Sequence, residues 1–191
     1  VEIASSEELG RRLAINPEQI RKDLAFFGQF GKKGVGYYVA ELKESIGGIL
    51  GLDNHWNVAI IGMGHLGAAL ANYQGIARLG FRLAAIFDAN PVVIGTRVGE
   101  RRVEDIAYLA EIIAERAIQI GVIAVPAAAA QGVADRLVDA GIRGIWNFAP
   151  VKLQVPPSIA FVSEDLSVGL SSLSYYLTHT TEDEDDLSEK N

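Results

Sequence analysis

The strongest constraint on the fold is a glycine-rich turn between an apolar run and a helix-forming stretch. The segment reads Val58-Ala-Ile-Ile-Gly62-Met-Gly64-His-Leu-Gly67, and Asp88 follows 21 residues after Gly67, at the end of a second apolar run. The first glycine allows a tight turn, the second lets the backbone approach a pyrophosphate, and the third lets the helix pack closely on the strand. The pattern predicts a dinucleotide-binding turn whose helix amides face the phosphates.

Asp88 narrows the choice of dinucleotide. A carboxylate at this strand end accepts hydrogen bonds from both ribose hydroxyls and repels a 2′-phosphate, which favours NAD(H) over NADP(H). Two other interpretations stay open: a glycine turn that holds no ligand, and Asp88 as a cap of the local turn.

The pattern around the turn predicts an α/β fold. Apolar runs alternate with amphipathic stretches from Trp56 to Phe148, which is typical of a Rossmann-type, doubly wound parallel sheet buried on both faces. The expected strands are 57–61, 83–87, 118–125 and 144–148, and the expected helices are 65–79, 103–116 and 127–140. Ligands bind such a sheet at the carboxyl ends of its strands.

Two further strands end at that same edge. Val125 and Pro126 end one of them, and Asn147 and Phe148 end the other. We expect these four residues to contribute to the coenzyme site. The alternative is ordinary punctuation, since Pro126 also suits the first position of a helix.

Residues 1–52 follow a different pattern. Ser5-Ser-Glu-Glu8 fits a capping box that opens a short helix, and Asn16-Pro17 suits the start of a second helix, which Gly28 ends. Arg21 and Lys22 lie on the outer face of that second helix, and a glycine-flanked basic tip, Gly31-Lys-Lys-Gly34, precedes a short apolar strand. These features predict a helix-turn-helix with a β-wing, although a solvated basic helix and loop explains them equally well.

An amphipathic helix over 165–178 follows the sheet. Its apolar residues pack either on its own domain or on a second subunit. Beyond it, residues 182–191 contain six acidic residues and one lysine, which predicts a solvated, disordered end. The expected organisation is a winged-helix domain (1–52), a Rossmann domain (53–163), a dimerisation helix (164–180) and an acidic disordered tail (181–191).

Composition excludes several classes of protein. The chain has 191 residues and no cysteine, so disulfides, thiolate catalysis and cysteine-based metal sites are absent, and no metal site is expected. No apolar run is long enough to cross a bilayer and the start lacks a signal peptide, so we expect a cytoplasmic protein.

A dehydrogenase usually needs a general acid or base beside the nicotinamide, and none of the three histidines is well placed for that role. Little chain remains to enclose a substrate either, so we expect no enzyme activity. The alternative is an NAD-dependent oxidoreductase or a coenzyme A-binding, ligase-type domain.

Four spaced motifs give the chain a specific resemblance over residues 3–178. They are Ile20-Arg-Lys-Asp-Leu-Ala-Phe-Phe-Gly28, Gly31-Lys-Lys-Gly-Val-Gly-Tyr37, Ile61-Gly-Met-Gly-His-Leu-Gly67 and Gly144-Ile-Trp-Asn-Phe-Ala-Pro150. Together they resemble the Rex family of redox-sensing transcriptional repressors. The resemblance implies a homodimer with a swapped C-terminal helix, which binds double-stranded operator DNA in the presence of NAD⁺ and releases it when NADH binds.

The resemblance also implies roles for individual residues. The implied coenzyme contacts, beyond the strand ends above, are Gly62, Met63, Gly64, His65, Leu66, Gly67, Ala69, Tyr73, Asp88, Asp165 and Leu166. The implied DNA contacts are Ser5, Ser6, Arg21, Lys22, Lys33 and Gly34. Tyr73, expected eight residues into a continuous helix, matches a switch tyrosine, and Asp165 matches the start of the exchanged helix.

The chain departs from the family pattern at three places. The first helix of the winged domain, which carries the basic partner of the aspartate, is expected to be missing from the printed sequence. Leu166 stands where some members have an aromatic ring, and Ala124 where threonine is common. These two differences affect the expected affinity for coenzyme.

Overall fold

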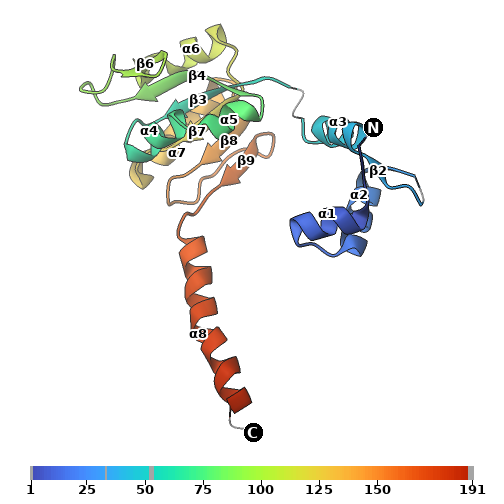
Figure 1. Ribbon diagram of the computed structural model, residues 1–191. Helices are drawn as coiled ribbons and strands as arrows, with labels where there is room; N and C mark the ends of the chain where they lie inside the picture. The colour runs from blue at the N-terminus through green and yellow to red at the C-terminus, as the bar shows by residue number, and fades with distance from the viewer. Residues whose placement is uncertain (1, 33, 52–53, 189–191) are drawn as a thin grey trace. The chain divides into compact units, whose positions relative to one another are not determined.

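The computed structural model describes residues 2–32, 34–51 and 54–188. The chain forms two compact units, one up to His55 and one from Trp56 onward, and each is described by itself. Figure 1 labels the helices and strands.

A seven-stranded sheet forms the centre of the second unit, in the order β5-β6-β4-β3-β7-β8-β9. All neighbouring pairs are parallel except β5 and β6. The strands are β3 (Trp56–Ile61), β4 (Phe81–Asp88), β5 (Arg97–Val98), β6 (Arg101–Asp105), β7 (Ile120–Ile123), β8 (Gly144–Asn147) and β9 (Ala160–Ser163). The predicted α/β class with a mostly parallel sheet is confirmed.

Apolar side chains on both faces of β3 explain why this sheet is covered on two sides. Ala59 and Ile61 pack in a large cluster with α6 (Leu109–Glu115) and α7 (Ala127–Asp139). Val58 and Ile60 point to the other face, in a smaller cluster with Leu70 of α4 (His65–Ala71). Alternation of side chains along a strand sends neighbours to opposite faces, so a continuous apolar run is buried twice.

The helix expected over 65–79 is two helices in the structure. α4 ends at Ala71, and α5 (Gln74–Arg78) begins after Tyr73, whose backbone is extended. The side-chain amide of Asn72 donates to the carbonyl of Ala68, at 2.8 Å. Asparagine bonds to nearby backbone in this way at turns and helix ends, so the expected continuous helix is wrong at this position.

The helix expected over 103–116 begins later than predicted. Residues 101–105 form β6, where Val103 pairs with Ile86 and is 2% exposed. A 3-10 turn, η1 (Ile106–Tyr108), precedes α6, and Asp105 caps it by accepting from the amide of Ala107. The predicted helical segment is therefore divided between strand β6, which lies between β5 and β4 in the sheet, a 3-10 turn and a shorter helix.

The first unit contains three helices and a two-stranded antiparallel sheet among the described residues. They are β1 (Ile3–Ala4), α1 (Ser6–Leu13), α2 (Pro17–Phe27), β2 (Tyr37–Tyr38) and α3 (Val39–Ile49). A bridge between Lys32 and Gly36 closes the loop before β2, with Gly34 at its tip. Two helices joined by a short turn are followed by a hairpin-like loop, as the sequence predicted.

The last helix, α8 (Val168–Ser188), differs at both ends from its prediction. It begins three residues later and continues through the acidic segment, where the sequence predicted disorder from residue 181. The backbone hydrogen bonds of a helix form within one chain, so an acidic sequence is compatible with helical geometry. In the part of the chain that the structure describes, no helix is both long and apolar enough to span a membrane.

Candidate functional site

The glycine turn between β3 and α4 has a geometry that only glycine permits at two positions. Gly62 has a φ of +101°, and a Cβ there would lie 2.5 Å from the carbonyl oxygen of Ala124. A Cβ on Gly67 would lie 1.8 Å from the carbonyl oxygen of Gly62. The turn and the first turn of α4 therefore pack backbone against backbone, as close helix–strand packing at this motif requires.

Gly64 differs from the other two glycines. A Cβ at this position would meet no atom within 4 Å, and Gly64 is the residue that precedes α4. The first amides of a helix have no acceptor within it, so those beside Gly64 are available to an anion. His65, exposed, and Leu66, half-buried, occupy this first turn, and Ala69 is exposed one turn further along.

Asp88 ends β4 beside this turn. One carboxylate oxygen accepts from the amide of Met63 at 2.6 Å, and the other accepts from the amide of Asn90 at 2.7 Å. The carboxylate thus connects two loops at the carboxyl edge of the sheet, although 25 residues separate it from Met63. The sequence predicted that Asp88 lies near the turn but did not reveal the Met63 contact, which depends on the parallel pairing of β3 and β4.

Two other strands end at the same edge, and their residues differ in what they can offer a ligand. Val125 is half-buried against the core, and exposed Pro126 directly precedes α7. Asn147 is 0% exposed, and its amide group donates to the carbonyls of Ala149 and Val151 and to the hydroxyl of Ser163. The side chain of Asn147 therefore holds the loop after β8, a structural role that the sequence had not separated from ligand binding.

Phe148 is half-buried and lies beside Trp146, with ring centroids 4.5 Å apart. Both rings belong to the smaller apolar cluster, on the face of the sheet that α4 covers. Phe148 follows the end of β8, so it remains a candidate at the rim of the site.

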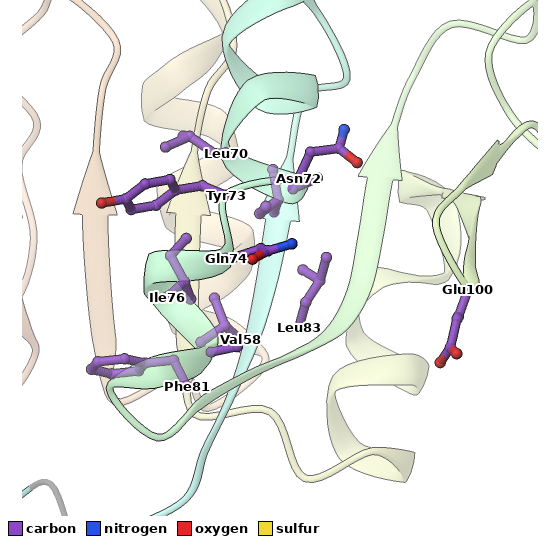
Figure 2. Close-up of a pocket in the computed structure, with 12 residues that line it drawn as sticks. Val58, Leu70, Asn72, Tyr73, Gln74, Ile76, Phe81, Leu83 and Glu100 are labelled. Atoms are coloured by element: carbon purple, nitrogen blue, oxygen red, sulfur yellow. The ribbon is translucent and has the colours of Figure 1, made fainter.

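Tyr73 lies on that same face, in the link between α4 and α5 (Figure 2). It is 65% exposed and lines a hollow of about 550 Å³ with apolar residues of β3, β4 and both helices. Those residues include Val58, Ile60, Leu70, Ile76, Phe81 and Leu83. The glycine turn does not line this hollow, so the structure does not join Tyr73 to Asp88 in one cavity.

Asp165 and Leu166 precede α8. One carboxylate oxygen of Asp165 accepts from the hydroxyl of Ser167 at 2.6 Å and from its amide at 2.8 Å. These two hydrogen bonds, that of the hydroxyl first, hold the pKa of Asp165 below its usual value, so the carboxylate is ionised at neutral pH. Leu166 is 66% exposed, and the structure shows no contact between Asp165 and Tyr73.

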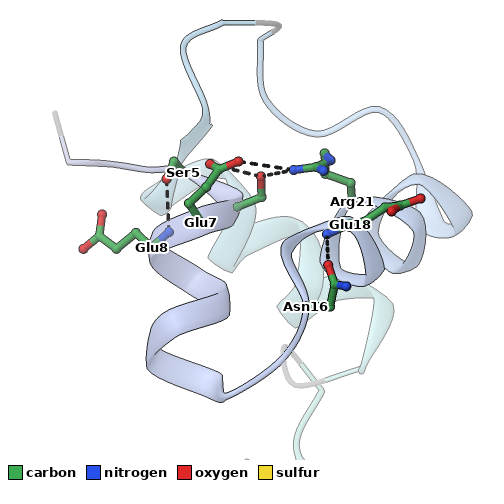
Figure 3. Close-up of polar contacts among 7 residues, drawn as sticks. Ser5, Glu7, Glu8, Asn16, Glu18 and Arg21 are labelled. Carbon is green, nitrogen blue, oxygen red and sulfur yellow. Dashed lines mark hydrogen bonds and ion pairs between the residues drawn. The ribbon is translucent and has the colours of Figure 1, made fainter.

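In the first unit, a side-chain cap stabilises the start of each of the helices α1 and α2. Ser5 precedes α1 and accepts from the amide of Glu8 at 3.1 Å, and Asn16 precedes α2 and accepts from the amide of Glu18 at 2.8 Å (Figure 3). Both predicted helix starts are confirmed. Ser5 has its hydroxyl acceptor engaged in this cap.

Arg21 bridges the two helices. Its guanidinium donates to the hydroxyl of Ser6 at 2.8 Å and to the carboxylate of Glu7 at 3.3 Å, and Figure 3 shows both contacts. The pKa of Glu7 is lowered by its own backbone amide, then by the Ser5 hydroxyl and by the charge of Arg21. Lys22 takes no part in these contacts; its ammonium pairs with the carboxylate of Glu18, on the same helix, at 3.0 Å.

A hollow of about 420 Å³ brings most of the predicted DNA contacts of this unit together. Ser5, Ser6, Arg21 and Gly34 line it, whereas Lys22 does not, and Lys33 lies outside the described residues. Lys32 also lines the hollow, with its ammonium 5.5 Å from the ring centre of Tyr38. Lys32 was not among the predicted DNA contacts, although it belongs to the same basic tip, Gly31-Lys-Lys-Gly34.

The residues at the carboxyl edge fit a dinucleotide. Gly64 leaves open space, Gly62 and Gly67 hold the turn, and Asp88 offers two carboxylate oxygens beside it. No group of His, Asp and Glu side chains within the described ranges is arranged to hold a metal ion.

The second unit matches a known protein family. Residues 53–151 match the family described as CoA binding domain. The match includes the glycine turn, Asp88 and the ends of β7 and β8.

Curated relatives match nearly the whole chain. The redox-sensing transcriptional repressor Rex of Chloroflexus aurantiacus is 47% identical over 182 residues, which is 95% of this chain and 86% of the relative. The protein of the same name from Clostridium perfringens is 45% identical over 179 residues, or 94% of this chain and 84% of the relative.

Two solved structures of a Rex-family repressor called RSP also match. RSP in complex with β-NAD⁺ and operator DNA has a TM-score of 0.89 and 41% identity, covering 100% of this chain and 88% of that one. RSP in complex with β-NADH has a TM-score of 0.83 and 40% identity, covering 100% of this chain and 86% of that one.

Proposed function

Because the chain belongs to the Rex family of redox-sensing transcriptional repressors, we propose that it is a repressor whose homodimer binds operator DNA and releases it when NADH binds. The observation that carries this proposal is the coexistence of two different sites in one chain. One unit has a basic hollow beside two helices joined by a turn, and the other has a glycine turn that fits a dinucleotide.

The coenzyme is assigned to the carboxyl edge of the sheet. Gly62, Gly64 and Gly67 shape the pyrophosphate turn, and Met63, His65 and Leu66 supply its remaining backbone. Asp88 accepts from the ribose hydroxyls after releasing the amide of Met63, which it binds at 2.6 Å in this structure. The residues placed around this centre are Ala69, Tyr73, Val125, Pro126, Asn147, Phe148, Asp165 and Leu166.

DNA is assigned to the first unit. Arg21 reaches base edges in the major groove, where a guanidinium pairs bidentately with guanine, and Lys22 lies beside it. The loop with Lys32, Lys33 and Gly34 enters the minor groove as a wing. Ser5 and Ser6 contact phosphate from the start of α1.

The dimer is assigned to α8. Its apolar residues are exposed within one chain, including Leu170, Leu173 and Leu177 at 58% to 74%. An exposed apolar stripe of this length is typical of an interface. A second copy, exchanging this helix, covers it and brings Asp165 to the other subunit's coenzyme site.

The response to redox state follows from charge. The nicotinamide ring is positively charged when oxidised and neutral when reduced. The ionised carboxylate of Asp165 interacts more favourably with the charged ring, and Tyr73 accepts a new partner when that interaction is lost. Exchange of partners between Asp165 and Tyr73 then changes the relative orientation of the subunits, which sets the spacing of the two DNA-reading helices.

We further propose that the chain performs no catalysis and acts in the cytoplasm. The named relatives are transcription repressors, and His65, inside the glycine turn, is poorly placed to act on a second substrate. The match of residues 53–151 to the CoA binding domain family supports one alternative, an acyl-coenzyme A-binding role for the second unit. That alternative predicts coenzyme A binding without an effect on duplex DNA.

Fluorescence anisotropy of a labelled palindromic duplex tests the proposal. The protein is titrated onto the duplex at one fixed salt concentration, without ligand, with NADH, with NAD⁺ and with coenzyme A. We expect binding that NADH weakens and NAD⁺ does not. Equal DNA affinity in all four titrations contradicts the proposal, and the salt concentration must be held constant because phosphate contacts dominate affinity.

A further inference from the structure

Five arginines gather at the amino end of the sheet, away from the coenzyme edge. Four of them, Arg97, Arg101, Arg102 and Arg116, line a hollow of about 470 Å³ together with Glu100 and Glu104. Arg101 and Arg116 also line a neighbouring hollow of about 280 Å³ with Arg82, Ala84 and Asn57. The two hollows therefore share a pair of guanidinium groups.

The location follows from the topology of the second unit. Arg82 is the second residue of β4, and Arg101 is the first residue of β6. Gly62 directly follows β3 and Asp88 ends β4, so both lie at the opposite edge of the sheet. A ligand held by these arginines is consequently separate from one held by the glycine turn.

Among the residues described, only two of the five arginines bond to other groups of the protein through their side chains. Arg116 donates to the carbonyl of Ala84 at 3.1 Å and pairs with Glu104 at 2.9 Å. Arg102 donates to the carbonyl of Gly95 at 3.0 Å. Within the described ranges, the guanidinium groups of Arg82, Arg97 and Arg101 make no hydrogen bond or ion pair.

The residues that line the two hollows include more positive than negative side chains. Five guanidinium groups face two carboxylates, and one of these, Glu104, is already paired with Arg116. Neighbouring like charges repel, and the repulsion is strongest where a concave surface limits screening by water and salt. An anion in the hollow would relieve this repulsion and satisfy the open donors.

We propose that this arginine cluster is a binding site for a polyphosphate anion, the chemistry of a nucleoside di- or triphosphate. Guanidinium groups bind phosphate oxygens with two parallel hydrogen bonds, and they stay charged at every physiological pH. Two adjoining hollows that share Arg101 and Arg116 suit a chain of phosphates better than a single one. The site is independent of the function proposed for the coenzyme edge and of the DNA surface of the first unit.

Inorganic tripolyphosphate is the probe, because it has no base or ribose to occupy the coenzyme site. Calorimetric titration of the full chain, saturated with NADH, is expected to show binding, and the anion is expected to raise the melting temperature. Orthophosphate is expected to bind more weakly. Affinity for tripolyphosphate is expected to fall as salt rises, since the partly exposed charges are screened.

The double variant Arg97→Gln/Arg101→Gln removes two guanidinium groups that hold nothing in the protein, so it is expected to fold normally. Its affinity for tripolyphosphate is expected to fall at least about tenfold, the loss typical of one hydrogen bond to a charged group. Lys152→Gln, which removes an exposed positive charge elsewhere in the same unit, is the matched control and is expected to bind as the parent does.

Three results would overturn the proposal. One is equal affinity of the parent and the double variant for tripolyphosphate. Another is displacement of tripolyphosphate by NADH, which would place the anion at the glycine turn. The third is a double variant that loses affinity for nonspecific duplex DNA while keeping its affinity for tripolyphosphate, which would make the cluster a DNA-backbone contact.

Discussion

At the scale of single residues, the two close glycine contacts determine whether the coenzyme turn can form. The carbonyl oxygen of Gly62 lies where a Cβ on Gly67 would need to be, and neither atom belongs to a flexible side chain. Substitution here must therefore move the backbone of β3 or of α4.

Gly67→Ala is expected to cost about 1–3 kcal/mol of stability, as overpacking typically does, and to reduce affinity for NADH by at least tenfold. Gly132→Ala is the matched control. Gly132 lies inside α7 with open space around its Cβ position, so alanine is expected to stabilise the protein by about 0.5–1 kcal/mol. Thermal denaturation and NADH titration measure both effects, and equal behaviour of the two variants would contradict the argument.

The contact between Glu7 and Arg21 gives a pH-dependent prediction. The pKa of Glu7 is lowered by its backbone amide, by Ser5 and by Arg21, so the ionised form stabilises the first unit. This contribution is present above the ordinary glutamate pKa of 4.5 and is lost as the pH falls through the lowered value.

Glu7→Gln is therefore expected to be less stable than the parent at pH 7, and the difference is expected to shrink as the pH falls below about 4.5. Denaturant titrations at several pH values measure it. A difference that stays constant down to pH 3 would show that the charge of Glu7 has no part in it.

At the scale of elements, the sequence predicted the buried strands well because each is a continuous apolar run between turn residues. The same reasoning missed β5, β6 and β9. β5 has two residues and β9 is an edge strand with an exposed valine, Val162, so neither has the apolar run of a central strand. Such strands are defined by pairing with a neighbour, which a local pattern does not contain.

The contacts of the candidate sites also fall into two groups, those that a local sequence pattern predicts and those that only the fold creates. Helix caps at Ser5 and Asn16 depend on residues two or three positions apart and were predictable. The bonds from Met63 to Asp88 and from Arg21 to Ser6 join residues 25 and 15 positions apart, and only the folded chain brings them together. The break between α4 and α5 at Tyr73 was not predicted, because the alanine-rich stretch before it favours a continuous helix. Asn72 ends that helix.

The prediction for DNA binding concerns Arg21 of α2. Arg21→Gln is expected to weaken operator binding by about 1–3 kcal/mol and to relax base preference at one position of each half-site, because a bidentate contact to guanine is lost. Arg12→Gln is the control, since Arg12 is an exposed arginine of α1 that pairs with Glu8. Anisotropy with a set of single-base operator variants distinguishes the two, and a uniform loss across all sequences would indicate a phosphate contact instead.

At the scale of the whole molecule, charge and apolar surface are distributed unevenly. The first 52 residues contain equal numbers of basic and acidic residues, whereas the last ten contain six acidic residues and one lysine. Most of the net charge of −7 therefore comes from the last ten residues, and the unit proposed to bind DNA has no net charge over residues 1–52.

The exposed leucines of α8 give the prediction at this scale. Leu170→Asp combined with Leu173→Asp places two charges on the apolar stripe and is expected to convert the proposed dimer to a monomer and to abolish operator binding. Ser172→Asp adds a charge on the opposite side of the helix and is expected to leave the dimer intact. Sedimentation equilibrium measures the mass, and a double variant that remains dimeric would assign the interface elsewhere.

The backbone packing of the turn against α4 has a kinetic consequence. Because Gly62 and Gly67 pack backbone against backbone, the turn has little conformational freedom to lose, and we expect coenzyme binding to order little additional chain. We therefore expect a repressor built this way to respond to its coenzyme without a slow folding step.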